Sequence, residues 1–329
     1  MMRVLVFRFF LKLNSLILNL FNISLFIKTP DKELVNELWA SYKELPTYGD
    51  ISSTNLSEEH ALEAWQQNLN VLRESVLNNQ IDLFLSWPVI SKTMNLGINA
   101  DFIYDEIKYL KKHKNWKIYK KGIREDWFGH RSMYAFYPSS SAILIHHGYH
   151  IAQFESITNT NIIDQDCILE FGGGFGSMCR LNYNLGFDGG YIIFDFSHFS
   201  LLQKYYLKNI NIPVVSVNEF MKTKKGVVCI SDLEQLKAIL DIFDNKTKML
   251  LIATWSLSEA PISVRDLFID CCDNVSSFLI AYQDNFASID NKKYFNSFQK
   301  KRDKLFWADN KIEHLPSDYY LFGSKNIKV

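Results

Sequence analysis

The segment at residues 167–178, CILEFGGGFGSM, constrains the fold of this chain more than any other. An apolar run ends in Glu170, glycines recur at Gly172, Gly174 and Gly176, and apolar residues then resume at helical spacing. This order predicts a buried strand, a tight turn and the start of a helix. Glycines in such a turn accept positive φ angles and let a ligand lie against bare main chain. The segment therefore predicts an α/β fold with a nucleotide-like ligand at the turn.

Strands and helices alternate after residue 159. Short apolar runs rich in β-branched and aromatic residues predict strands, and most are separated by segments with helical periodicity. The strands are expected at 167–170, 191–196, 212–217, 226–230, 248–255 and 277–283. This alternation predicts a Rossmann-like, doubly wound parallel sheet that binds ligands at the carboxyl ends of its strands. The last segment, 311–325, predicts a terminal antiparallel hairpin.

The region before the sheet is predicted to be mainly helical. Helices are expected from Asp31 to about Leu45, from an N-cap at Ser57 to about Val76, and at 100–113 and 141–157. Aromatic-rich loops are expected around residues 116–138. The chain is therefore divided into a basic segment at 1–28, a helical substrate or cap region at 29–158, and a ligand-binding domain at 159–329.

The glycine pattern discriminates between two classes of ligand. A dinucleotide site of the form G-x-G-x-x-G needs a third glycine where this chain has Ser177. With Glu170 ending the strand, E-x-G-x-G-x-G instead resembles motif I of class I S-adenosylmethionine (SAM) methyltransferases. That resemblance implies SAM as the cofactor, bound by Glu170, Gly172, Gly174 and Gly176. A glycine-rich turn without a ligand is the alternative.

Two further acids follow predicted strands. Asp195 lies 23 residues after Gly172, where an acid can accept hydrogen bonds from both ribose hydroxyls of an adenosine. Asp232 follows the strand at 226–230, and the resemblance implies a contact with the adenine amino group. Each acid could instead cap the helix that follows it. Glu219 competes with Asp232 for the adenine contact.

The end of the strand at 248–255 faces the transferred methyl group in the methyltransferases that this chain resembles. Trp255 is therefore expected to form a wall of the SAM pocket. Glu259 could accept a proton from an acceptor hydroxyl as a general base. Its alternative role is to cap the next helix.

A histidine cluster, His146-His147-Gly-Tyr-His150, lies in the helix before the first strand of the sheet. Histidine is the commonest general base near neutral pH, so His147 or His150 is a candidate for that role. Packing inside the helical core is the alternative. No third ligand stands nearby in the sequence, so no metal site is predicted. His130 and Arg131 are further candidates for binding substrate or the SAM carboxylate.

Three segments, EFGGGFGSMCRL, FDFSHFSLLQKYYLKN and ATWSLSEAP, together resemble sugar O-methyltransferases encoded in bacterial surface-polysaccharide clusters. The resemblance covers about residues 163–285. It implies methyl transfer from SAM to a hydroxyl of a sugar, nucleotide sugar or glycan. Methylation of another small molecule, a non-catalytic scaffold with this fold and a dinucleotide-dependent oxidoreductase are the alternatives.

Composition narrows the range of partners and compartments. Lys plus Arg and Asp plus Glu both total 36, so the basic excess typical of nucleic-acid binding is missing. The five cysteines form no C-x-x-C pair, and most lie in apolar runs. Free buried thiols fit a reducing compartment, so we expect a cytoplasmic enzyme that does not act on nucleic acid.

The first 28 residues contain Arg3, Arg8, Lys12 and Lys28 and no acid, and residues 13–27 carry no charge. An uncharged run of this length is shorter than the roughly 20 residues of a spanning helix. It predicts a basic amphipathic helix on the inner face of an anionic membrane. Packing on the body of the protein, packing on a second subunit in a homo-oligomer, and a signal peptide are the alternatives.

Overall fold

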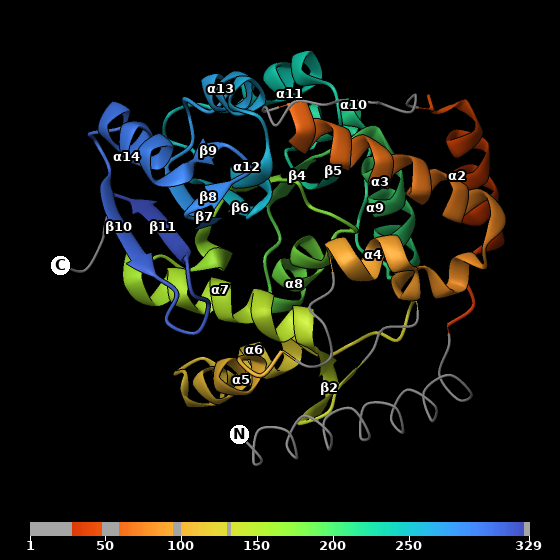
Figure 1. Ribbon diagram of the computed structural model, residues 1–329, viewed down its shortest axis with the longest axis horizontal. Helices are drawn as coiled ribbons and strands as arrows, with labels where there is room; N and C mark the ends of the chain where they lie inside the picture. The colour runs from red at the N-terminus through yellow and green to blue at the C-terminus, as the bar shows by residue number, and fades with distance from the viewer. Residues whose placement is uncertain (1–27, 48–58, 95–99, 130–132, 326–329) are drawn as a thin grey trace.

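The computed structural model describes residues 28–47, 59–94, 100–129 and 133–325 (Figure 1). Residues 1–27, the expected N-cap Ser57, and His130 and Arg131 lie outside these ranges.

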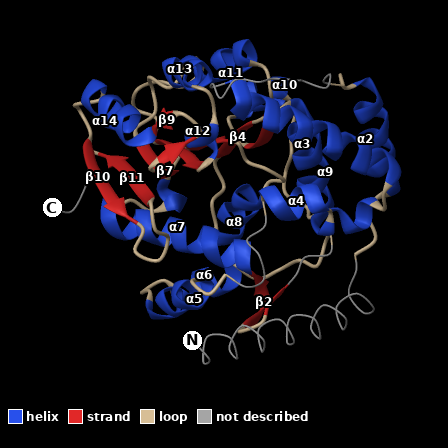
Figure 2. Ribbon diagram, viewed as in Figure 1, coloured by secondary structure: helices blue, strands red, loops and turns tan. Residues whose placement is uncertain are grey.

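A seven-stranded sheet forms the centre of the fold (Figure 2). Its strands are β3 (Cys167–Phe171), β4 (Gly190–Phe194), β5 (Gly226–Ile230), β6 (Met249–Thr254), β7 (Ser277–Gln283), β10 (Phe306–Lys311) and β11 (Asp318–Ser324). They are ordered β10-β11-β7-β6-β3-β4-β5. Strands β3 to β7 run parallel, and β11 is antiparallel to both β7 and β10. The predicted Rossmann-like sheet and its terminal antiparallel hairpin are confirmed.

Helices cover both faces of the sheet because successive side chains of each strand point to opposite sides. Ile168 of β3 joins one core cluster and Leu169 joins the other. The first cluster contains residues of α2 (Lys32–Glu44), α3 (Glu59–Asn78), α4 (Pro88–Thr93), α5 (Ile103–Lys112), α6 (Trp116–Gly122), α7 (Ala142–Thr158), α8 (Ser177–Leu185) and α9 (Ser197–Asn209). The second contains residues of α10 (Val217–Thr223), α11 (Leu233–Leu240), α13 (Ile262–Asp270) and α14 (Asn291–Lys301).

Helix α7 is the central helix of the first layer. Ser141 caps its N-terminus by accepting from the Leu144 amide, and Asn159 ends it in the left-handed conformation at φ 53°. Most of its side chains are buried on all sides, as in a helix enclosed by neighbours. It packs against α5, α8 and β11. The predicted helical region before the sheet is confirmed, although it shares one core with the sheet.

The order of the strands reverses beside β3. The chain passes from β3 to β4 and β5 on one side and then returns to β6 on the other. The carboxyl ends of β3 and β6 therefore diverge into separate loops and leave a crevice, which is where such sheets bind ligands. The glycine segment follows β3, and the segment from Trp255 onward follows β6.

The structure corrects several secondary-structure predictions. Residues 116–138 contain helix α6 and part of a small hairpin of β1 (Met133–Tyr134) and β2 (Tyr137–Ser141), where loops were expected. Residues 212–217 form only an isolated bridge at Val214 before α10 begins. The first strand of the terminal hairpin is at 306–311, so residues 312–317 are its connection. The remaining short elements are η1 (Ile81–Ser86), η2 (Ile162–Asp164), α12 (Ser256–Glu259), β8 (Asn285–Phe286) and β9 (Ile289–Asp290).

Candidate active site

A cavity of about 730 Å³ opens at the carboxyl ends of the parallel strands. Its walls come from the loops after β3, β4 and β6, from α4 and α7, and from the connection before β11. A volume of this size is typical of small-molecule sites. The cavity lies where the reversal of strand order predicts a ligand.

The glycine loop forms one wall of the cavity and needs its glycines. Gly172 and Gly174 have φ angles of +71° and +58°, which side chains rarely adopt. A Cβ atom at Gly172 would collide with Ser256, whose hydroxyl donates to the Phe171 carbonyl. The loop after β6 therefore packs directly on the start of the glycine loop. Bare main chain faces the cavity at Gly172, Gly173 and Gly174.

Asp195 lines the cavity at the end of β4 and fixes the same loop. Its Oδ2 accepts hydrogen bonds from the Gly174 amide and from Gln203 Nε2, both at 3.0 Å. Gln203 Nε2 also donates to the Gly174 carbonyl at 2.9 Å. Oδ1 accepts from the Phe196 amide at 2.7 Å. A carboxylate has about four acceptor positions, so one is free for a ligand hydroxyl. Gln203 therefore connects the backbone of the glycine loop to the Asp195 carboxyl group and fixes their relative position.

Glu170 lies at the floor of the cavity and is only 4% exposed. The Tyr191 hydroxyl donates to its Oε2 at 2.8 Å. Gly173 leaves room for this carboxyl group, because a Cβ there would lie 3.2 Å from Glu170 Cδ. The structure thus places Glu170 and the three loop residues from Gly172 to Gly174 together, while Gly176 packs against Leu207 in the first core layer.

Trp255 forms another wall of the cavity and holds a strained backbone at φ +63°. A bulky residue with positive φ is an outlier that the surrounding structure must enforce. Here the indole Nε1–H donates to Asp318 Oδ1 at 2.7 Å, and the ring stacks on His146 with centroids 5.5 Å apart. The strained turn directs the segment that carries Glu259 along the cavity wall.

Glu259, at the end of α12, and Asp318, at the start of β11, both line the cavity. Ser258 donates to Gln283 Oε1 at 2.6 Å, and the Gln283 amide hydrogen-bonds Glu259. The buried Arg265 donates to the carbonyls of Ser258 and Ala260, on either side of Glu259. These contacts hold the carboxyl group of Glu259 in place, whereas a simple helix cap would leave it exposed.

The base candidate that the structure favours was not selected from the sequence. His146 lines the cavity, and its Nδ1 lies 2.7 Å from Oε1 of Glu106, a fully buried carboxyl group. His314 Nε2 lies 2.7 Å from the same oxygen. Burial would raise the pKa of Glu106, but the charges and hydrogen bonds of His146 and His314 outweigh it and lower that pKa. An ionised Glu106 accepts the Nδ1 proton of His146 and leaves Nε2 as the basic nitrogen.

The other two histidines of the cluster lie differently. His147 lines the cavity, as expected, and stays a candidate. His150 is a correction: it does not line the cavity, it is fully buried, and its Nδ1 is hydrogen-bonded to the Tyr320 hydroxyl. Burial lowers the pKa of His150 well below its ordinary value. His150 therefore packs in the core beneath the site.

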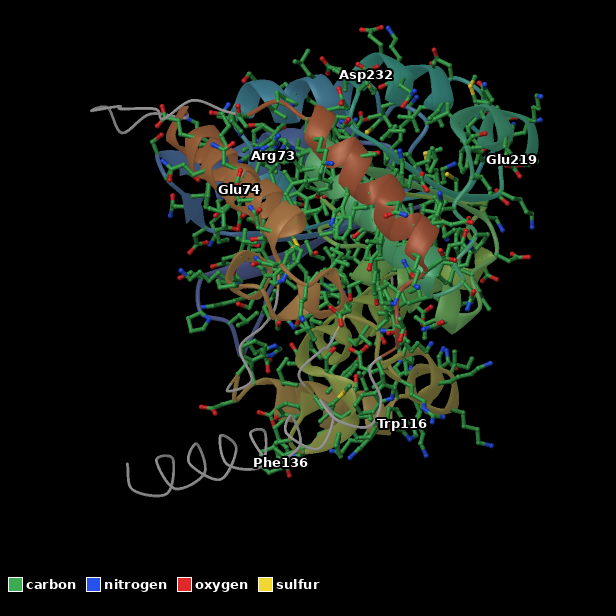
Figure 3. All side chains as sticks on the ribbon, turned by 90° about the vertical axis from the view of Figure 1, so that its right-hand side faces the viewer. Arg73, Glu74, Trp116, Phe136, Glu219 and Asp232 are labelled. Atoms are coloured by element: carbon green, nitrogen blue, oxygen red, sulfur yellow. The ribbon has the colours of Figure 1, made fainter. Side chains whose placement is uncertain are left out.

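Asp232 is a second correction. Its carboxylate accepts from the Gln235 amide at 2.7 Å, so it caps α11 and is exposed outside the cavity. Glu219 is also exposed, on α10, and Figure 3 labels both acids on the outer helices. Ser231, the neighbour of Asp232, is the residue that lines the cavity after β5.

The buried carboxyl group of Glu170 and the half-buried ones of Asp195 and Glu259 predict how stability depends on pH. Burial raises the pKa of Glu170 to about 8 and the pKa values of Asp195 and Glu259 to about 7. In the unfolded chain such groups titrate near pH 4, so above that pH the folded state holds protons that the unfolded state has lost. These three groups should therefore contribute a stability that falls as the pH rises from about 5 to about 8 and then levels off.

Calorimetry of the ligand-free protein across this range checks the expectation. Glu259→Gln keeps the shape of the side chain and removes one of the three groups, so its melting temperature should depend less on pH than that of the wild type. A wild-type melting temperature that increases steadily from about pH 5 to about pH 8 would contradict the assignment.

Metal ligands and membrane spans were also sought. Within the described ranges, no group of three or more His, Cys, Asp or Glu side chains could hold a metal ion. All five cysteines are free thiols, and Cys271 is the one that is partly exposed. No helix among the described residues combines the length and the apolarity that crossing a bilayer requires.

Comparison with known proteins yields likeness in fold alone. No protein-family model and no curated protein matches the sequence. Among solved structures, the chain is similar to the SAH-bound methyltransferase PaMTH1 of Podospora anserina, with 10% identity, 86% of this chain and 100% of that chain covered, and a TM-score of 0.36. It is also similar to the plantazolicin methyltransferase BamL, with 9% identity, coverage of 82% and 100%, and a TM-score of 0.36. The precorrin-6y C5,15-methyltransferase of Geobacter metallireducens shows 12% identity, coverage of 52% and 85%, and a TM-score of 0.32. TM-scores this low carry no functional weight, so the fold assignment rests on the strand order of this chain.

Proposed function

We propose that this protein is a SAM-dependent O-methyltransferase that methylates a sugar hydroxyl. The observation that carries the proposal is the pairing of His146 with the ionised Glu106 at the wall of the cavity that the glycine loop also lines. A histidine held in this way can accept a hydroxyl proton, and the bare loop can accommodate an extended cofactor.

The residues of the cavity fit SAM in their chemistry. Gly172, Gly173 and Gly174 offer a bare surface to the methionine part, and the free acceptor position of Asp195 can take a ribose hydroxyl. Bound SAM would supply an electrophilic methyl group on a sulfonium. Glu170 lines the same cavity, where an oxygen of its carboxyl group can accept a hydrogen bond from the ammonium of the methionine part.

The chain's own residues would position the acceptor and take its proton. His146 Nε2 is the basic nitrogen available to an acceptor hydroxyl, and Glu106 stabilises the imidazolium that forms. Trp255 and Phe102 present ring surfaces to the cavity, and Glu259 and Asp318 present hydrogen-bonding oxygens. Most of the acceleration would come from holding the hydroxyl in line with the methyl group.

The scarcity of cationic side chains in the cavity favours an uncharged acceptor. Among its described lining residues, four carboxyl groups (Glu170, Asp195, Glu259 and Asp318) stand against one lysine, Lys92. The diphosphate of a nucleotide sugar would meet Glu259 and Asp318, whereas a neutral sugar could hydrogen-bond to them. We therefore favour a neutral glycosyl group, in cytoplasmic synthesis of a bacterial surface polysaccharide.

Calorimetric titration with SAM, followed by mass spectrometry of a panel of neutral, amino and nucleotide sugars, tests the proposal. We expect SAM to bind and a neutral sugar to gain one methyl group. The Asp195→Ala variant should bind SAM markedly more weakly with an unchanged circular dichroism spectrum. Binding of NADH without SAM would support an oxidoreductase, and SAM binding without transfer would support a scaffold.

A further inference from the structure

Helices α5 and α6 carry a concentrated positive charge on a chain with no net charge. Seven lysines, here called the lysine face, lie within residues 108–121: Lys108, Lys111, Lys112, Lys114, Lys117, Lys120 and Lys121. No acid interrupts this stretch, and all seven side chains are exposed. Since Lys plus Arg and Asp plus Glu balance over the chain, the rest of the protein carries a compensating negative charge. The protein is therefore electrically polarised.

The packing of the two helices turns the lysine face outward. Ile103, Ile107 and Leu110 of α5 are buried, as are Tyr119 and Gly122 of α6. The two helices pack against α7 and α8, respectively. Figure 1 shows α5 and α6 together at one end of the molecule, and Trp116 of α6 is labelled at that end in Figure 3. The lysines thus lie on the exposed sides of two neighbouring helices and of the turn between them.

Acids within the described part of the chain leave this charge largely uncompensated. Counting acids of the described ranges only, Lys108 is the one member with an acidic partner within 4 Å, Asp105 at 3.8 Å. Three other acids nearby have partners of their own. Glu106 is buried between His146 and His314, and Glu125 is buried against Arg180. The half-buried Glu155 accepts from the Tyr119 hydroxyl and the Ile162 amide and interacts electrostatically with Lys114. Mutual repulsion of the lysines would be relieved by an anionic partner.

Apolar side chains lie among the lysines and indicate which anionic partner fits. Ile118 of α6 is 45% exposed, and Tyr104 of α5 is 40% exposed. A lipid surface binds favourably to exposed apolar side chains and to lysines together. Apolar groups enter the headgroup region, and lysines pair with anionic phosphates. A nucleic-acid backbone would gain nothing from Ile118. We propose that the lysine face docks on the surface of a bilayer containing anionic phospholipid, independently of the reaction that the protein catalyses.

The sequence offers a second contribution to the same attachment. Stable membrane binding usually needs two signals, because one weak contact is readily reversed. The first 28 residues contain four basic residues, no acid and an uncharged run at 13–27. Docking by the lysine face should therefore persist in weakened form when this segment is removed.

Co-sedimentation of the full chain with vesicles tests the proposal. Vesicles of phosphatidylcholine with phosphatidylglycerol should bind the protein, and pure phosphatidylcholine should not. Lys112→Glu combined with Lys117→Glu and Lys121→Glu should lower the partition coefficient by at least about tenfold. The control combines Lys293→Glu, Lys300→Glu and Lys301→Glu on α14; it changes the net charge equally and should bind like the wild type. Ile118→Ser should weaken vesicle binding to a smaller extent.

Three results would overturn the proposal. One is wild-type vesicle binding by the triple variant of the lysine face, with an unchanged melting temperature. A second is complete loss of binding when only residues 1–28 are removed. The third is retention of a labelled oligonucleotide by the lysine face together with no pelleting on anionic vesicles, which would assign the surface to nucleic acid.

Discussion

Replacing Gly174 with valine should abolish SAM binding while the rest of the sheet folds. Gly174 has a φ of +58°, and a β-branched residue there costs roughly 1–2 kcal/mol in backbone strain alone. A Cβ would also lie 3.0 Å from Met94 Sδ on the wall of the cavity. The Gly174 amide would then lose its hydrogen bond to Asp195. We expect calorimetry to show affinity reduced by at least about 100-fold.

A matched variant distinguishes a direct effect of Gly174→Val on SAM binding from a general effect of backbone strain. Gly186 has a φ of +106° at the end of α8, outside the cavity, and a Cβ there would lie 3.8 Å from its nearest neighbour, Ile163. Gly186→Val should lower the melting temperature and leave SAM affinity unchanged. If Gly174→Val binds SAM as tightly as Gly186→Val does, the glycine loop does not hold the cofactor.

Replacing His146 with asparagine should reduce kcat by about 10²–10⁴-fold, the contribution typical of a general base. The affinity for SAM should change little, because His146 contacts Trp255 and Glu106 while the glycine loop carries the cofactor. Glu106→Gln should reduce kcat less and shift the acidic limb of the pH–rate profile, since an amide cannot stabilise an imidazolium as a carboxylate does. Rapid-quench or steady-state assays of methyl transfer measure both effects.

Two other histidines provide control variants for His146→Asn. His113 lies outside the cavity and hydrogen-bonds the Asn115 amide at 3.2 Å, so His113→Asn should leave kcat unchanged. His147→Asn probes the other histidine that lines the cavity. If His147→Asn loses turnover and His146→Asn keeps it, the base is His147 and the interaction with Glu106 is structural.

The parallel, doubly wound class of the sheet follows from local patterns in the sequence. Apolar runs such as that of β3 alternate with helices, and this alternation restricts the chain to a parallel sheet with a crevice where the order reverses. Local patterns also predicted the turn that the glycines of residues 172–176 form after β3, and the position of Asp195 at the end of β4. A turn that needs positive φ and an acid at the end of a strand are determined by residues adjacent in sequence.

The roles of individual side chains were less accessible to sequence analysis. Asp232 caps α11 and His150 packs on Tyr320, because the rotation of each element decides which side of it faces the cavity. His146 stood beside the selected histidines, and helical spacing alone does not say which of three neighbours meets a ligand. Helix α6 was missed because its lysines and its buried Tyr119 form too short a periodic pattern.

The sequence by itself determined the α/β sheet, the glycine loop and the acid after β4, because each depends on contacts within a few residues of chain. Tertiary structure alone decided the grouping that we propose as catalytic. Glu106, His146 and His314 are separated by 40 and 168 residues, and they meet only because α5, α7 and the connection before β11 pack together. The sequence around Glu106 contains no pattern that predicts this contact, because the packing of α5, α7 and the connection before β11 determines which histidines the carboxylate meets.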